Sequence, residues 1–132
     1  MLARINFHEF SERLNSSDVA RGCFTYEAKN IIFNHLDQDE DYVMPSACDV
    51  ACQWWEATYS DLKNDFNYDE EFRQIYKDAQ QWCDGESEKD YNESIIEGVC
   101  EYLKERTIFL DVANCGEDCD LETVTFVYAK NF

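Results

Sequence analysis

Two pairs of cysteines have a spacing at which thiolates could share a metal ion. Three residues separate Cys48 from Cys52, and three separate Cys115 from Cys119. Four thiolates could together bind a structural zinc ion, but such sites usually use more tightly spaced ligand pairs, and we expect Cys52 inside a secondary-structure element. The sequence therefore predicts no metal and no other cofactor, with thiols that pack as small apolar side chains.

Other residue patterns give little support for catalysis. We expect His8 in a short terminal helix and His35 near an acidic helix end, where each serves at the surface or in packing. The chain has no phosphate-binding loop, no Gly-x-Ser-x-Gly elbow and no His-Glu-x-x-His motif. The acidic residues in 117–120 lack the ligand spacing of a calcium-binding EF-hand. We predict that the protein is not an enzyme, and a small metal-dependent or thiol enzyme is the weakest alternative.

Charge is the strongest feature of the sequence. The chain carries 29 acidic and 11 basic side chains, for a formal net charge of -18. Solubility of a small domain needs only roughly 2–8 net charges. A negative field of this strength repels phosphates, which argues against direct nucleic-acid binding, and it attracts basic proteins or cations.

The acidic side chains gather in four runs, at 37–41, 61–71, 84–93 and 117–122. Carboxylates three or four residues apart on a helix lie roughly 5–6 Å apart at Cβ. This is comparable to the spacing of phosphates along a nucleic-acid strand, about 3.4 Å per phosphate. Although a solvated face is the usual explanation of a single run, four runs on a small body suggest a surface that could occupy a nucleic-acid-binding groove.

Trp54 and Trp55 lie between two of these runs. In a strand, successive side chains point to opposite faces, so one ring would be buried and the other exposed. Core packing is the simpler interpretation, and an anchor at a protein interface is the alternative. The predicted partner-binding residues are the two tryptophans and the acidic residues of the flanking runs: Asp37, Asp39, Glu40, Asp41, Trp54, Trp55, Asp61, Asp65, Asp69, Glu70 and Glu71.

Periodicity predicts the elements that must position these side chains. Apolar residues at helical spacing predict helices within 1–15, from residue 26 to about 36, after residue 60, over 70–83 and from residue 91. The expected helix caps are Asn6, Thr25, Ser60 and Asp90. From residue 107 the period changes to two, which predicts strands over 107–112 and 123–128. The segment 49–56 could be a third strand or a turn of helix that runs into a strand, and we favour a strand from about Cys52 to Thr58.

These elements predict one domain, residues 1–132, of the α+β class. We expect a small antiparallel sheet with a C-terminal β-hairpin, packed against several amphipathic helices on one face. A chain of 132 residues suits one core. Because no signal peptide or membrane span is apparent and the seven cysteines are an odd number, we expect a reduced, cytosolic protein without a membrane partner.

Several short motifs, in order along the chain, resemble those of small acidic proteins encoded by bacteriophages and prophages. They are Phe-Thr-Tyr-Glu at 24–27, the segment 49–56 followed by Tyr-Ser at 59–60, Tyr-Leu at 102–103 with Thr-Ile at 107–108, and a final Asn-Phe at 131–132. This chain differs in having Trp54 and Trp55 where the others have paired cysteines, and in a long insertion around 67–90. The resemblance implies an accessory protein that acts in the host cytoplasm.

Charge and resemblance together lead to two hypotheses. The first is a phage-encoded inhibitor of a host defence protein, of the anti-CRISPR or antirestriction type, that imitates nucleic acid and occupies a basic groove. The alternative is a non-catalytic phage interaction module that binds a host protein through an aromatic patch at Trp54 and Trp55. Salt discriminates between them, since mimicry predicts binding that weakens steeply with ionic strength.

Overall fold

The computed structural model describes residues 5–38, 45–82, 85 and 87–130. These residues form six helices and three strands, and the predicted α+β class is confirmed. Their order along the chain is α1 (Phe7–Asn15), α2 (Tyr26–Asp37), α3 (Ala47–Gln53), β1 (Trp54–Thr58), α4 (Tyr59–Phe66), α5 (Glu70–Trp82), α6 (Glu88–Arg106), β2 (Phe109–Ala113) and β3 (Thr125–Ala129). Among them, no helix is both long and apolar enough to cross a bilayer.

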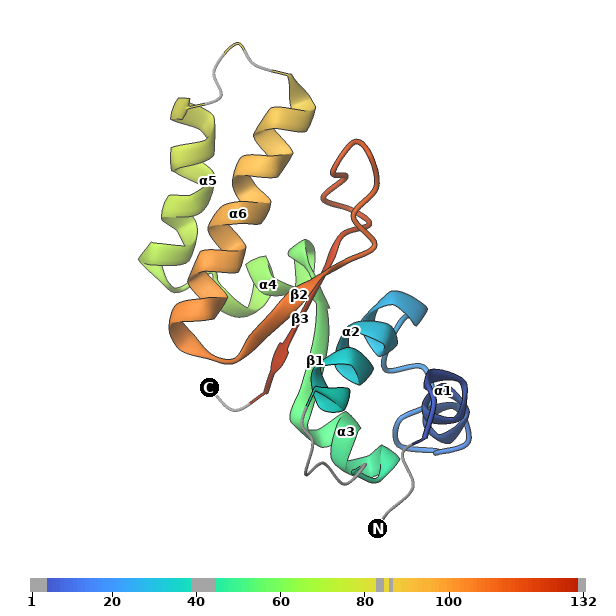
Figure 1. Cartoon of the computed structure of the whole chain (residues 1–132). Helices are drawn as coiled ribbons and strands as arrows, with labels where there is room; N and C mark the ends of the chain where they lie inside the picture. Colours follow the sequence, from blue (N-terminus) through green and yellow to red (C-terminus); the bar gives the residue numbers. More distant parts are fainter. Residues whose placement is uncertain (1–4, 39–44, 83–84, 86, 131–132) are drawn as a thin grey trace.

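An antiparallel sheet occupies the centre of the molecule, with β3 between β1 and β2 (Figure 1). Across β1 and β3, Trp54 is opposite Ala129 and Thr58 is opposite Thr125. The pairing of β2 with β3 confirms the predicted antiparallel C-terminal hairpin. The third strand is present, but it begins only at Trp54, because the residues before it form the seven-residue helix α3. The favoured start at Cys52 is therefore wrong, and the alternative of a helix that runs into a strand is the correct one.

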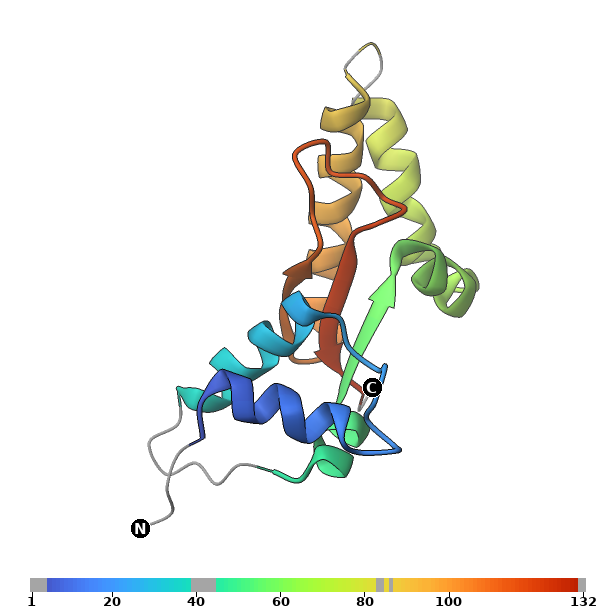
Figure 2. The ribbon, with the colours of Figure 1, turned by 90° about the vertical axis from the view of Figure 1, so that its right-hand side faces the viewer.

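Helices cover both faces of the sheet, so the prediction of helices on one face is wrong (Figure 2). Val127 and Ala129 of β3 belong to a core that includes residues of α1, α2 and α3. Phe126 and Tyr128, which point the other way, belong to a core with residues of α4, α5 and α6. All five residues of β3 are buried. Apolar side chains occupy both alternating sets of positions in this central strand, and each set needs its own cover.

Two of the predicted helix caps are confirmed. The Asn6 side chain accepts a hydrogen bond from the backbone N–H of Glu9 over 2.8 Å at the start of α1. At the start of α2, the Thr25 hydroxyl accepts one from the backbone N–H of Ala28 over 3.4 Å. Both helices begin at these residues because each cap satisfies a donor that has no partner inside the helix.

The other two predicted caps are wrong. Helix α4 begins after Thr58 rather than Ser60, because Thr58 and Asp61 exchange side-chain hydrogen bonds with each other's backbone N–H groups. Helix α6 begins after Ser87, whose hydroxyl accepts from the backbone N–H of Asp90 over 3.2 Å. Asp90 therefore lies in the first turn, where a carboxylate faces the positive end of the helix dipole.

Helices α5 and α6 form an antiparallel pair at one end of the molecule (Figure 1). They approach closely at Gly98, where an added Cβ would lie 2.5 Å from Cγ2 of Ile75. The absence of a side chain at this position of α6 makes room for the β-branched Ile75 of α5.

Candidate partner-binding surface

An exposed tryptophan and two carboxylates share one surface, which we call the Trp55 surface: Trp55, Asp61, Asp65, Tyr128 and Lys130. Trp55 and Tyr128 are cross-strand neighbours in β1 and β3. The Trp55 side chain is 43% exposed, whereas its neighbour Trp54 is 6% exposed. The prediction of one buried and one exposed ring is confirmed, and Trp55 is the ring that a partner can reach.

Lys130 covers one side of the Trp55 ring. Its ammonium nitrogen lies 4.6 Å from the centroid of the ring, within the range of a cation–π interaction. The same nitrogen donates a hydrogen bond to the backbone oxygen of Ala51 in α3 over 2.7 Å. The backbone N–H of Lys130 donates to the oxygen of Gln53 over 2.9 Å. These bonds to the end of α3 orient the ammonium group and fix it beside the indole.

Asp61 and Asp65 bring negative charge to the same surface. They lie four residues apart on α4, the spacing that places two side chains on one helix face. This region contains two shallow pockets, of about 210 and 280 Å³. Trp55 and Asp61 line the first, and Trp55 and Asp65 line the second. Burial, together with these two carboxylates, raises the pKa of Tyr128 to about 12. An exposed indole flanked by carboxylates suits an arginine or lysine side chain.

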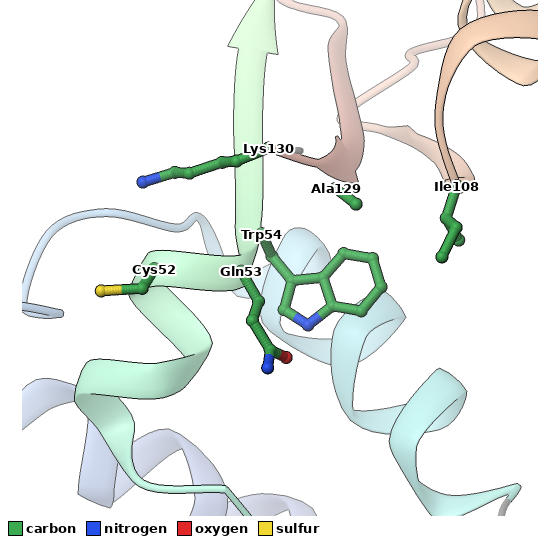
Figure 3. Close-up of a pocket in the computed structure, with 6 residues that line it drawn as sticks. All are labelled: Cys52, Gln53, Trp54, Ile108, Ala129 and Lys130. Atoms are coloured by element: carbon green, nitrogen blue, oxygen red, sulfur yellow. The ribbon is translucent and has the colours of Figure 1, made fainter. Parts of the chain in front are cut away.

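Trp54 lies on the opposite face of the sheet and serves the core. Its ring packs edge-on against His35, with ring centroids 5.2 Å apart. It lines a pocket of about 370 Å³ together with Ile108. Figure 3 shows the ring pointing toward Ile108, whereas the Lys130 and Cys52 side chains point to the other side. Of the two interpretations of Trp54, the structure supports core packing.

Two predicted binding residues take part in an ion cluster between α5 and α6. The hydroxyl of Tyr102 donates a hydrogen bond to Asp69 over 2.5 Å. Arg106 forms an ion pair with Glu71, and its guanidinium lies 3.6 Å from Asp69. Both carboxylates therefore hold the start of α5 against the end of α6, while Glu70 between them is exposed in the first turn of α5.

Of the four acidic residues predicted to bind in the run 37–41, Asp37 is the one that the structure describes. Asp37 is half-buried at the end of α2, the helix that covers the face of the sheet opposite Trp55. Asp39, Glu40 and Asp41 lie outside the described residues. From the predicted set, the structure brings together Trp55, Asp61 and Asp65.

The two cysteine pairs lie at opposite ends of the sheet. Cys48 and Cys52 are on α3, which leads into the Trp54 end of β1. Cys115 and Cys119 are in the loop at the other end of the sheet, with sulfur atoms 3.7 Å apart. This separation does not allow the four thiolates to bind one ion, and no group of three or more His, Cys, Asp or Glu among the described residues is arranged to hold a metal.

Sequence reasoning missed a polar network around Glu56. One carboxylate oxygen of Glu56 accepts from the backbone N–H of Thr25 over 2.7 Å. The other accepts from the hydroxyls of Thr25 and Thr125 over 2.7 and 2.6 Å. The side-chain amide of Asn114 adds a donor at 3.2 Å. This network joins β1, β3 and the start of α2. No local sequence pattern predicts it, because its members are at least 31 positions from Glu56 in the sequence.

Sequence reasoning also missed that two acidic runs become neighbours. The first turns of α6 and the loop between β2 and β3 enclose a pocket of about 580 Å³. We call it the acidic pocket; it is lined by Glu88, Lys89, Asn92, Asp118, Asp120 and Glu122. Residues of the runs 84–93 and 117–122 thus form a second concentration of carboxylates, apart from the Trp55 surface.

Comparison with known proteins finds no relative: no family model matches, and neither a curated protein nor a solved structure is similar. The resemblance to phage-encoded acidic proteins therefore stays a prediction from short motifs.

Proposed function

We propose that this protein is a non-catalytic inhibitor that places an acidic surface in the nucleic-acid-binding groove of a basic protein. The observation that carries the proposal is unneutralised charge. The net charge is -18, and the ion pairs formed between two described residues use Arg21, Lys104 and Arg106 as cations. Most described acidic side chains have no described lysine or arginine within ion-pair distance. Such a surface attracts a groove lined by lysine and arginine and accelerates its capture.

The Trp55 surface supplies the contact that charge alone lacks. A field of many carboxylates steers a partner but discriminates poorly among basic proteins, whereas a tryptophan is a common anchor of specific interfaces. Trp55 is exposed beside Asp61 and Asp65 on a sheet edge that α3 and α4 flank. The resemblance suggests the class of target, a host defence protein such as a CRISPR effector or a restriction enzyme, met by a phage-encoded protein in the host cytoplasm.

The test is competition for a nuclease captured from a host lysate. The captured nuclease is titrated with DNA or guide RNA in the presence and absence of the protein, at low and at moderate salt. Mimicry predicts mutually exclusive binding and an affinity of the protein that falls steeply with salt. Simultaneous binding, with unchanged affinity for the nucleic acid, would rule out mimicry.

Asp65→Asn and a matched control localise the contact. Asp65→Asn removes one charge from the Trp55 surface with little change of shape, and we expect weaker binding and a flatter salt dependence. The control is Glu12→Gln, which removes one exposed charge from α1, a helix that covers the other face of the sheet. Equal effects of the two variants would show that only net charge matters.

A second function has a specific observation in its favour. The 43% exposure of Trp55 suits an interaction module that binds a host protein chiefly through its aromatic surface, with the charge serving solubility. This alternative predicts that Trp55→Ala abolishes capture while raised salt leaves capture almost unchanged.

A further inference from the structure

The acidic pocket lies away from the Trp55 surface, at the other end of the strands. Trp55 is near the start of β1, whereas the loop of residues 114–124 follows β2 at the end of the sheet where Thr58 meets Thr125. Figures 1 and 2 both show this loop beside the first turns of α6. Because two separate segments form its walls, the pocket exists only in the folded chain.

A buried amide opens into this pocket. Asn92 of α6 is 8% exposed and lines the pocket, yet its side chain forms no hydrogen bond to another residue of the described chain. Among the described residues, Nε1 of Trp54 is the only fully buried side-chain polar atom that lacks a hydrogen-bond partner. The amide atoms of Asn92 are therefore not fully buried, and a group that enters the pocket can reach them. The amide is thus left to bond with whatever occupies the pocket, either water or a ligand.

The charges around the amide select a cationic ligand. Glu88, Asp118 and Glu122 make no ion pair with a described residue, and Lys89 is the one cation of the lining. One oxygen of Asp120 accepts from the backbone N–H of Glu122 over 2.9 Å, which leaves its second oxygen for a ligand. The pocket thus offers four carboxylates and one amide oxygen as acceptors against one ammonium group.

The size and spacing of the acceptors favour an organic cation over a metal ion. No three of the described metal-ligating side chains converge tightly enough to chelate an ion. A volume of about 580 Å³ accommodates a side chain. A guanidinium group carries five N–H donors in one plane and can reach several separated acceptors at once, whereas an ammonium group is a single compact charge.

We propose that the acidic pocket binds the guanidinium group of an arginine side chain, with the Asn92 amide oxygen and the carboxylates of Glu88, Asp118, Asp120 and Glu122 as acceptors. The identity of the arginine rests on the proposed function, in which the partner is a basic protein and the pocket is a second contact beside the Trp55 surface.

The direct test is a titration of the isotopically labelled full chain with N-acetyl-arginine amide, followed by NMR at constant low ionic strength. We expect saturable shifts of the Asn92 side-chain amide signals and of the backbone signals of 117–122. N-acetyl-citrulline amide has nearly the same shape without the charge, and N-acetyl-lysine amide has the charge without the plane. Equal binding of either compound would overturn the assignment to guanidinium.

Two variants and a control connect the binding to the pocket. Asn92→Ala should weaken the arginine amide about tenfold, because it removes a hydrogen bond to a charged group. Glu122→Gln, at an exposed position, should weaken it several-fold and provides a second test if Asn92→Ala impairs folding. Glu12→Gln on α1 removes the same charge far from the pocket and should leave the affinity unchanged. Equal losses in Glu122→Gln and Glu12→Gln would mean that arginine is attracted by net charge alone, which overturns the pocket.

The free amino-acid derivative needs no nuclease, so the two proposals fail separately. If the arginine amide does not bind but the protein still competes with nucleic acid, only the pocket proposal is overturned. If the arginine amide binds but the protein does not compete, only the inhibitor function is overturned.

Discussion

The hydroxyl of Tyr102 in α6 donates a hydrogen bond to the carboxylate of Asp69 over 2.5 Å, and Asp69 immediately precedes α5. This bond is the main cause that lowers the pKa of Asp69, followed by a backbone N–H bond from Glu71 and the charges of Arg106 and Arg73. Burial and the nearby carboxylate raise the pKa of Tyr102. One hydrogen bond thus joins the two helices of the α5–α6 pair.

Tyr102→Phe should make the protein less stable near neutral pH and should reduce the part of the pH dependence of stability that comes from Asp69. A carboxyl whose pKa is lowered by folding stabilises the folded state above its unfolded pKa, and this stability is lost as pH falls through the lowered folded value. The ring contact with Phe72, at 5.2 Å between centroids, remains available to the phenylalanine. In thermal melts from about pH 7 to about pH 2, spanning the usual carboxyl range, the difference between the two proteins should shrink with acid. A difference that stays constant over this range would show that the Asp69 bond does not contribute.

Trp54→Ala should destabilise the protein far more than Trp55→Ala. Trp54 is 6% exposed in the core, and truncation of a buried tryptophan costs about 3–5 kcal/mol. Trp55 is 43% exposed, so its side chain buries less apolar area on folding than that of Trp54. Truncation of Trp55 should therefore affect partner binding more than folding. Urea denaturation of both variants measures the two free energies of unfolding. The reverse order would contradict the assignment of Trp54 to the core.

Gly98→Ala should destabilise the α5–α6 pair although alanine is the better helix former. The added methyl would lie 2.5 Å from Cγ2 and 3.3 Å from Cγ1 of Ile75, so the helices must move apart. Overpacking of this kind costs about 1–3 kcal/mol, against a gain of about 1 kcal/mol in helix propensity. Chemical denaturation measures the net effect.

Ile75→Ala provides the second half of this test, because it removes the two γ carbons that the methyl would meet. In the double variant Gly98→Ala/Ile75→Ala, the alanine at 98 should become neutral or stabilising relative to Ile75→Ala alone. An equal effect of the alanine in both backgrounds would mean that Ile75 is not the obstacle.

Salt should raise the melting temperature. With a net charge of -18 and few ion pairs among the described residues, repulsion among carboxylates destabilises the folded state, and ions screen it. From about 0.02 M to about 0.5 M sodium chloride, the Debye length falls from about 20 Å to about 4 Å. Calorimetry over this range should show a steady rise. A melting temperature that falls or stays level would indicate that ion pairs offset the repulsion.

Local sequence determined the beginnings of some helices and the alternation of the strands. The caps at Asn6 and Thr25 bond to N–H groups three residues away, so the sequence contains both partners side by side. The opposite burial of Trp54 and Trp55 follows in the same way from the two-residue period of a strand. The sequence also determined the excess of negative charge, which is a property of composition.

Only the tertiary structure decided which charges are neutralised and which stay available. Asp69 and Glu71 belong to an acidic run, yet Arg106 from the far end of α6 binds both, while Asp61 and Asp65 of the same run remain beside Trp55. The acidic pocket likewise needs the start of α6 and a loop near the C-terminus. These arrangements depend on the position of β3 between β1 and β2, which brings distant segments together over two separate cores. A periodic pattern depends only on residues a few positions apart, so it does not show which distant segments pack against each other.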